Sequence, residues 1–361
     1  MSNIIDYIRW RGDLSFTVAP FCEVDALILS QFSMFFWEDS SLASEPKPLK
    51  IFRPELKEGK ISAGFAEEDN IELLNVAMKS ERFGSILISD YVSEWDKNLE
   101  KQFAAVTFKL HDETRFISFR GTDSTIIGWK EDFKLAYSRP IHAQGSALSY
   151  LENIAEIYPE KLRIGGHSKG GNLAMYASAM TSRQIRDRII AVYNNDGPGL
   201  SERMDAKSLY AKIDSILHSF VPQSSVIGML LDHPDRFEVV RSDSVSVWQH
   251  NPYRWRVEGP RFVRADGLTK DSVYFNLVFA QWLAEVDEEE RSSLVDTIFE
   301  ILNSVNAENF GKEFWKNVAK NPRAVVSSIK HIDPETRKRI SAMLADLASS
   351  AVLRKSEKDN K

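Results

Sequence analysis

The sequence predicts an α/β fold in which a mostly parallel central sheet is flanked by helices. Two observations lead to this prediction. From residue 103 onward, short apolar segments of strand length alternate with longer segments that have helical periodicity. Such alternation implies crossover connections between parallel strands. In the middle of this region a glycine-rich turn, residues 166–171, lies between an expected strand and an expected helix.

The first hundred residues predict an N-terminal segment that is mainly helical. An apolar helix is expected over residues 24–36, with two acidic residues near its start. Prolines at 46, 48 and 54 indicate a loop. A second helix is expected over residues 71–82, where Phe83-Gly84 ends it.

The remaining elements define a core at about residues 100–285 and a helical tail. Strands are expected over 103–110, 115–119, 162–165, 188–193, 213–220, 237–240 and 244–248. Helices are expected over 125–137, 143–158, 171–177, 202–212 and 271–285. After residue 286 no strand signal remains, and apolar residues recur on one helical face. We therefore expect one domain over residues 1–285 and a helical C-terminal extension over 286–361.

The composition is that of a soluble globular protein, with 361 residues, 43% hydrophobic and 27% charged. A net charge of −6 gives no general attraction to nucleic acid, so no nucleic-acid partner is expected. No apolar run is long enough for a transmembrane segment, which leaves contact with a membrane surface open. The first residues lack a signal-peptide pattern, and the single cysteine, Cys22, fits a reducing compartment. These features predict a cytoplasmic protein.

The stretch Gly166-His167-Ser168-Lys169-Gly170 matches the G-x-S-x-G nucleophile elbow of α/β hydrolases. The elbow needs glycines because side chains two residues either side of the serine would collide with the neighbouring strand and helix. The helix that follows directs its first N–H groups at an oxyanion formed on the serine. Ser168 is therefore the expected nucleophile. The alternative is a glycine-rich strand-to-helix turn with an incidental serine.

An oxyanion hole is expected from two backbone N–H groups. One belongs to the residue after the nucleophile, Lys169, and the other comes from the loop after an upstream strand. The strand over 115–119 ends abruptly in Arg120-Gly121-Thr122, which makes Thr122 the second candidate. The alternative for this segment is a tight turn capped by Thr and Asp.

The general base must be a histidine that follows Ser168 and lies on a loop after the last strand. His250 meets this expectation, because it follows the strand expected over 244–248 and precedes the last core helix. His233 is the second choice. His167 is expected to point elsewhere, and His218 is expected to pack in the core.

The acid that orients this histidine is expected to be Asp196, which stands just after the strand over 188–193. Asp232 is the second choice. For Asp196 the alternative is a turn residue before Gly197-Pro198. No spacing of His, Cys and Asp is typical of a metal site and no phosphate loop is found, so no cofactor and no metal are expected.

At these segments the chain resembles the class 3 lipase branch of the α/β hydrolases. The shared residues are Arg120, Gly121, Thr122, Trp129, Asp132 and Gly166 to Gly171. Lys169 is a departure, because the lipases usually have Leu there, and a charge beside the nucleophile argues against their apolar entrance. Class 3 lipases usually place the acid one strand later, near residues 221–225, where this chain has no carboxylate.

The chain resembles still more closely a bacterial α/β-hydrolase domain family of unknown function. The segments that carry this resemblance are Val24 to Leu27, Asn195 to Gly199 and Trp248 to Pro252. The resemblance covers roughly residues 5–285. It implies the fold and leaves the substrate open.

Together these features predict a serine hydrolase that cleaves carboxylic esters or thioesters through an acyl-enzyme. The resemblance to lipases favours a small-molecule acyl ester or a lipid-like substrate. Two other functions stay open. A non-catalytic hydrolase-fold protein would bind a ligand or a partner, and an acyltransferase would use the same nucleophile with an acceptor other than water.

Overall fold

A computed structural model describes residues 2–276, apart from 43–44, 97, 100, 123–140, 202–203, 245, 271 and 274–275. The helix expected over 125–137, most of that over 271–285 and the extension over 286–361 lie outside the described residues, as do Trp129 and Asp132. The described α-helices are α1 (Ile4–Arg11), α2 (Glu23–Phe32), α3 (Arg53–Lys57), α4 (Glu67–Ala77), α5 (Glu81–Gly84), α7 (His142–Ile157), α8 (Lys169–Met180), α9 (Arg183–Arg186) and α10 (Ala206–Ala211). The described strands are β1 (Phe35–Phe36), β2 (Lys47–Pro48), β3 (Ser62–Ala63), β4 (Leu87–Asp96), β5 (Lys101–Lys109), β6 (Thr114–Phe119), β7 (Lys161–His167), β8 (Ile189–Asn195), β9 (Leu217–Pro222), β10 (Glu238–Val240), β11 (Val257–Glu258) and β12 (Arg261–Phe262). Short 3-10 helices are η1 (Leu49–Phe52), η3 (Asp214–Ile216), η4 (Ile227–Met229), η5 (Ser246–His250) and η6 (Pro252–Arg254).

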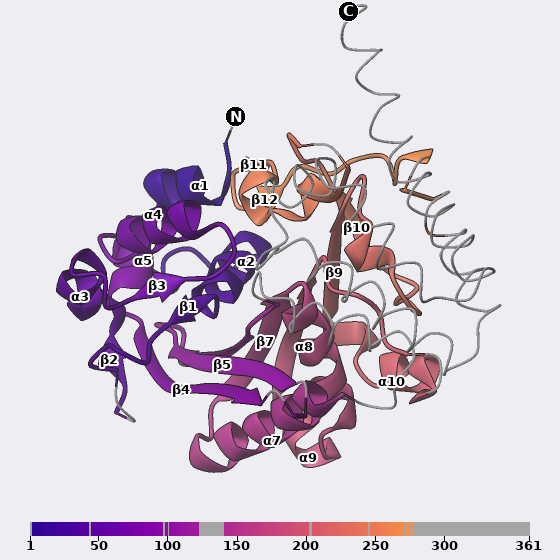
Figure 1. The fold of residues 1–361 in the computed structure, drawn as a ribbon, viewed down its shortest axis with the longest axis horizontal. Coiled ribbons are helices and arrows are strands. Elements are labelled where there is room, and N and C mark those ends of the chain that lie inside the picture. The colour runs from indigo at the N-terminus through magenta and orange to yellow at the C-terminus, as the bar shows by residue number, and fades with distance from the viewer. Residues whose placement is uncertain are drawn as a thin grey trace, which may run out of the picture.

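A central sheet of eight described strands runs through the molecule in the order β10-β9-β8-β7-β6-β5-β4-β2 (Figure 1). The strands from β6 to β10 pair in parallel, and β5, β4 and β2 extend the sheet in antiparallel pairing. Helices α1, α3, α4 and α5 gather beside one end of this sheet with β1 and β3, and α2 lies against its middle strands. The mostly parallel sheet flanked by helices confirms the predicted α/β fold class.

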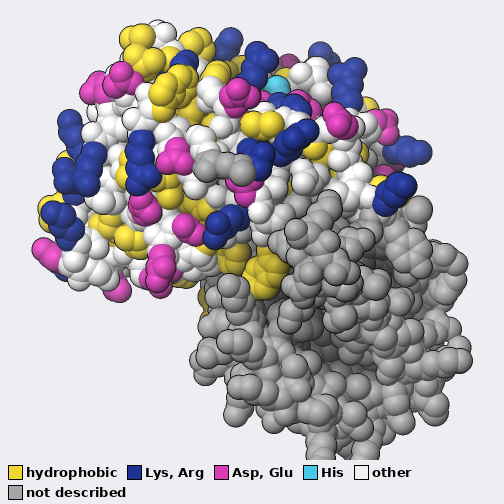
Figure 2. Space-filling model, turned by 90° about the horizontal axis from the view of Figure 1, so that it is seen from above, with side chains coloured by type: hydrophobic (Ala, Val, Ile, Leu, Met, Phe, Trp, Pro, Cys, Tyr) yellow, Lys and Arg dark blue, Asp and Glu magenta, His cyan; other side chains and the backbone are white. Residues whose placement is uncertain are grey.

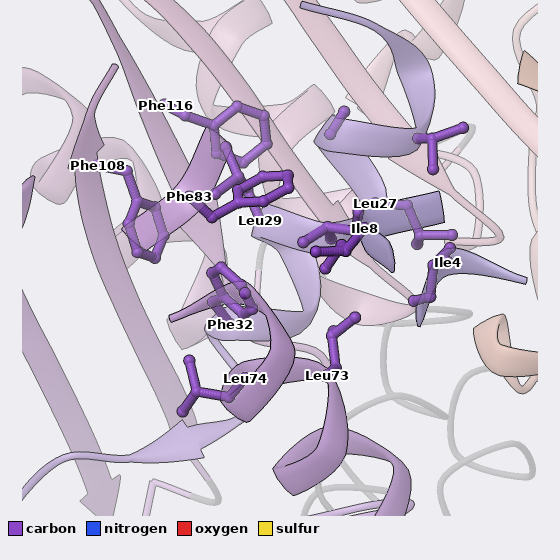
Figure 3. Close-up of a cluster of buried hydrophobic side chains, with 14 of the residues drawn as sticks. Ile4, Ile8, Leu27, Leu29, Phe32, Leu73, Leu74, Phe83, Phe108 and Phe116 are labelled. Carbon is purple, nitrogen blue, oxygen red and sulfur yellow. The ribbon is translucent and has the colours of Figure 1, made fainter. Parts of the chain in front are cut away.

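The two faces of the sheet bury separate hydrophobic cores because side chains alternate along each strand. On β6, Phe116 belongs to the core that α1 and α2 close, together with Phe108 of β5 (Figure 3). Its neighbour Ile117 points to the other core, which α7 and α8 close. The sheet is therefore covered on both faces, and its parallel strands are apolar on both sides, as expected for a buried parallel sheet.

Helix α2 is buried on all sides, since every residue from Val24 to Phe32 is buried. It packs on β6, β7 and β8, and the carbonyl of Leu29 accepts a hydrogen bond of 2.9 Å from the Ser118 hydroxyl. The predicted helix over 24–36 was too long. The chain leaves the helix after Phe32, and Phe35–Phe36 pair with β3. The apolar residues continue from the helix into the strand, so hydrophobicity gives no signal at this boundary.

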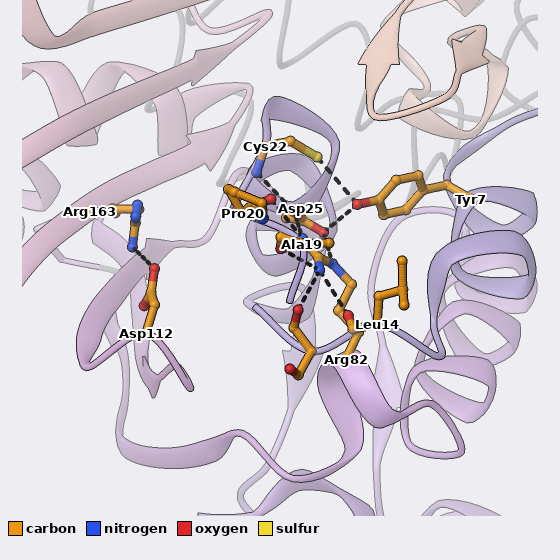
Figure 4. A network of polar contacts seen from close by, with 10 residues as sticks. Tyr7, Leu14, Ala19, Pro20, Cys22, Asp25, Arg82, Asp112 and Arg163 are labelled. Atoms are coloured by element: carbon orange, nitrogen blue, oxygen red, sulfur yellow. Dashed lines mark hydrogen bonds and ion pairs between the residues drawn. The ribbon is translucent and has the colours of Figure 1, made fainter. Parts of the chain in front are cut away.

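A buried ion pair ties the N-terminal helices together (Figure 4). The Arg82 guanidinium donates to both Asp25 carboxylate oxygens, at 2.8 and 2.5 Å, and to the carbonyls of residues 14, 19 and 20. The Tyr7 hydroxyl donates to the same carboxylate at 2.9 Å. Burial raises the pKa of the nearby Cys22 thiol, which keeps that thiol protonated and unreactive.

One strand was missed, and two other predictions about local structure were wrong. Strand β4 was not predicted, because a bulge after Ser89 and the positive φ of Asp90 interrupt its alternation. A strand was expected over 244–248, but from Ser246 onward the chain forms the 3-10 helix η5. His218 lies on β9 as expected, yet it is exposed and stacks on Tyr193 with ring centroids 5.0 Å apart.

The surface of the described part mixes charges of both signs. On the face drawn in Figure 2, basic and acidic side chains are interspersed over the described atoms. Among the described helices, none combines the length and the apolar character needed to cross a bilayer.

Candidate active site

The candidate catalytic residues follow neighbouring parallel strands at one edge of the sheet. Ser168 follows β7, and Asp196 follows β8. Arg120 follows β6. Ligands of open α/β sheets bind at this carboxyl-terminal edge. The topology therefore brings together segments that lie far apart in the sequence.

Ser168 occupies a strained turn between β7 and α8. Its backbone has φ 59° and ψ −132°, a sparsely populated combination that costs on the order of 1–3 kcal/mol. The turn holds because its N–H donates to the Asn195 carbonyl at 3.0 Å, and the neighbouring glycines leave room. A Cβ on Gly166 would lie 2.2 Å from the backbone of Gly170. The geometry is that of a nucleophile elbow.

The Arg120-Gly121-Thr122 segment packs directly on this elbow. A Cβ on Gly121 would lie 2.6 Å from the His167 carbonyl oxygen and 3.3 Å from Ser168 Cβ. Thr122 is the next residue, so its N–H belongs to the same short segment. The N–H of Lys169 lies at the first turn of α8, where the helix dipole favours negative charge.

The Lys169 side chain turns away from solvent. The residue is 1% exposed, and its ammonium group donates to the Gln102 carbonyl of β5 at 3.0 Å. The charge beside Ser168 is therefore held against the sheet, and the expectation of a less apolar entrance stays a prediction. Lys169 gives no reason to exclude an apolar substrate.

Asp196 and His250 form a hydrogen-bonded pair. Asp196 is fully buried, and its Oδ2 lies 2.7 Å from Nδ1 of His250. The positive φ of Asp196, 52°, turns the chain sharply at the end of β8, and Gly197 continues the turn. The residue is therefore a turn residue and a histidine partner at once, which combines the two roles that the sequence left open.

Ser225 is a second partner of the Asp196 carboxylate that the sequence analysis did not find. Its hydroxyl donates to Oδ1 at 2.5 Å and accepts a hydrogen bond from the Gly228 N–H at 3.1 Å. Ser225 lies in the segment after β9 where class 3 lipases usually carry their acid. Here that segment provides a donor to the carboxylate instead.

His167 was expected to point away from the site, but it lies against His250. The two imidazole centroids are 4.5 Å apart, and His167 Nε2 lies 2.8 Å from the carbonyl oxygen of His250. Burial lowers the pKa of His167 well below its usual value, and the neighbouring His250 lowers it further. His167 is therefore neutral near pH 7.

The second-choice residues do not join this arrangement. His233 contacts Phe237, with ring centroids 6.4 Å apart, and the backbone of residues 228–229. Asp232 pairs through its backbone with Leu200. Neither forms a hydrogen bond with Ser168 or Asp196 among the interactions of the described residues.

No hydrogen bond joins Ser168 Oγ to His250 Nε2 among the described residues. Such bonds are often long in free enzymes and shorten when substrate binds. Within the described ranges, no three His, Cys, Asp or Glu side chains gather closely enough to hold a metal ion.

The sequence was compared with protein families, and the fold with solved structures. The model of a family described as Mbeg1-like matches residues 77–300, more than half of the sequence. Lipase II from Rhizopus niveus is 14% identical, with 44% of this chain and 67% of that chain covered and a TM-score of 0.33. A mutant form of MDLA from Penicillium cyclopium is 11% identical, with 68% and 87% covered and a TM-score of 0.39. No curated protein sequence matches this chain. At these identities no residue role transfers, so the site rests on its own geometry.

Proposed function

The chain belongs to the Mbeg1-like family, and we propose that it is a serine hydrolase that cleaves carboxylic esters or thioesters. The hydrogen bond between Asp196 Oδ2 and His250 Nδ1 carries this proposal. A buried carboxylate on Nδ1 leaves Nε2 as the basic nitrogen of the imidazole and stabilises the cation that forms during turnover. That pair lies at the same sheet edge as a strained serine on an elbow.

In the proposed reaction, Ser168 Oγ attacks the carbonyl carbon of the substrate while His250 Nε2 removes the hydroxyl proton. The N–H groups of Thr122 and Lys169 donate to the oxyanion that forms. His250 then gives its proton to the leaving alkoxide or thiolate. Water, deprotonated by His250, attacks the acyl-enzyme, and the carboxylic acid leaves as Ser168 recovers its proton.

The proposed substrate is a small acyl ester or a lipid-like ester. The burial of Lys169 supports this class, because the charge of the elbow is held away from solvent. Ser225 supports the assignment of Asp196, because its hydrogen bond to Oδ1 fixes the orientation of the carboxylate whose Oδ2 meets His250.

The test is labelling of the full chain with a fluorophosphonate probe, compared with the variants Ser168→Ala and His250→Ala. We expect the wild type to be labelled, Ser168→Ala to be unlabelled and His250→Ala to react at least about 100-fold more slowly. His233→Ala is the matched control and should react like the wild type.

Absence of wild-type labelling would refute the hydrolase and favour a non-catalytic binding protein. Labelling that persists in Ser168→Ala would refute the nucleophile. A series of p-nitrophenyl esters of increasing chain length then tests the substrate class, and the same series with an added alcohol acceptor separates hydrolysis from acyl transfer.

A further inference from the structure

The imidazole of His167 lies beside the proposed general base, and the mechanism above does not use it. The residue precedes Ser168 and is 4% exposed. Its ring lies 4.5 Å from that of His250, with 33° between the ring planes. Because a carbonyl oxygen only accepts hydrogen bonds, the 2.8 Å contact with the His250 carbonyl means that Nε2 of His167 carries a proton and donates it.

We propose that His167 is a positioning residue, which holds His250 in register with Ser168 and stays uncharged while His250 becomes a cation. This role rests on the proposed function of the site, and it explains how the general base His250 is kept in place. His167 and Ser168 are consecutive residues, so one peptide unit separates the residue that holds the base from the proposed nucleophile. His250 cannot leave the elbow without breaking the bond to His167.

The rest of the His250 segment explains why this bond matters. Three hydrogen bonds hold the preceding residue, Gln249. Its side chain accepts from the Ser224 N–H and donates to the Ser244 carbonyl. Its backbone carbonyl accepts from the Trp255 indole. Among the described residues, His167 alone donates to the carbonyl of His250. The segment is a single short 3-10 helix, η5, which has little rigidity of its own.

The neutral state of His167 is the second part of the proposal. His250 takes a proton from Ser168 in each cycle, while Asp196, hydrogen-bonded to its Nδ1, balances that charge. A second cation 4.5 Å away would oppose the step. Burial of His167 prevents this, because burial disfavours the charged form of an imidazole.

A matched pair of variants tests the proposal. In His167→Gln the amide nitrogen is as many bonds from Cα as Nε2 of histidine, so the donor is kept. In His167→Asn the amide is one methylene shorter and does not reach the carbonyl. We expect fluorophosphonate labelling and kcat to fall by about 10- to 100-fold in His167→Asn, with KM little changed, and by less than about 5-fold in His167→Gln. Equal rates in the two folded variants would overturn the proposal.

A spectroscopic arm keeps the proposal separate from the proposed function. In a Ser168→Ala background, the proton between His250 Nδ1 and Asp196 should give a downfield NMR resonance. The resonance is assigned to this proton if it disappears when His250→Ala is added. We expect this resonance to persist in His167→Gln and to shift or broaden in His167→Asn. If the wild type is not labelled, the proposed hydrolase activity is refuted, but the NMR measurement still tests whether His167 positions His250. An unchanged resonance in both variants would overturn the positioning role.

Discussion

Replacement of Asp196 by asparagine is the sharpest perturbation of the proposed site. The carboxylate is fully buried, and its Oδ2 lies 2.7 Å from His250 Nδ1. At an effective dielectric constant of about 20, two opposite unit charges about 4 Å apart attract each other by about 4 kcal/mol, which sets the scale for this pair. Since each 1.36 kcal/mol is about tenfold in rate, Asp196→Asn should lower kcat/KM about 1,000-fold.

The assay is hydrolysis of a short p-nitrophenyl ester at pH 7.5, with thermal unfolding to verify the fold. Asparagine keeps the volume and can still accept from Ser225, so we expect the variant to fold. Asp232→Asn is the matched control, because Asp232 is partly exposed and pairs through its backbone. A folded Asp196→Asn variant that keeps more than a tenth of the activity would refute the reasoning, as would an equal loss in Asp232→Asn.

Three further predictions concern the groups around this pair and the N-terminal helices. Ser225→Ala removes the second donor to the Asp196 carboxylate, so kcat/KM should fall by about 10-fold or more, whereas Ser224→Ala should have little effect in the same assay. The contribution of His167 to the free energy of unfolding should fall by about 1.4 kcal/mol per pH unit below about pH 6.5, because the buried His167 stays neutral while the unfolded chain takes up a proton. The loss between pH 7.5 and pH 5.5, measured by urea unfolding, should therefore be smaller in His167→Gln than in the wild type. Asp25→Asn leaves the buried Arg82 charge without its carboxylate and should cost about 3–5 kcal/mol in urea unfolding, and a loss below about 1 kcal/mol would contradict this role of the ion pair.

The sequence alone predicted the elbow because its signal is local. The strand, the glycines and the start of α8 all lie within about twenty residues of Ser168. The short turn after β6 is local in the same way, so Thr122 could be placed beside the elbow from its order in the chain. These are properties of the backbone, which the sequence encodes directly.

The supporting residues could not be predicted, because they depend on which loops meet at the sheet edge. Ser225 approaches Asp196 from 29 positions away, and the side chain of His167 meets a carbonyl 83 positions away. A serine in a loop and a histidine in a motif carry no sign of such partners. Strand β4 escaped prediction for a different reason, since its bulge disrupts the period of two on which strand prediction depends.

Helix α2 has a consequence for the order in which this chain is made and folded. It is synthesised before the strands that bury it, and its residues from Val24 to Phe32, most of them apolar, are all buried in the folded protein. Its partners arrive much later, because Leu29 meets Ser118 after 89 residues and Ser30 meets Asn195 after 165. The contacts of α2 with β6, β7 and β8 can therefore form only after these strands have been synthesised. Contacts of such long range slow folding and expose aggregation-prone surface, so we expect a chain started at residue 77, where the family match begins, to lack the helix that closes one face of its sheet.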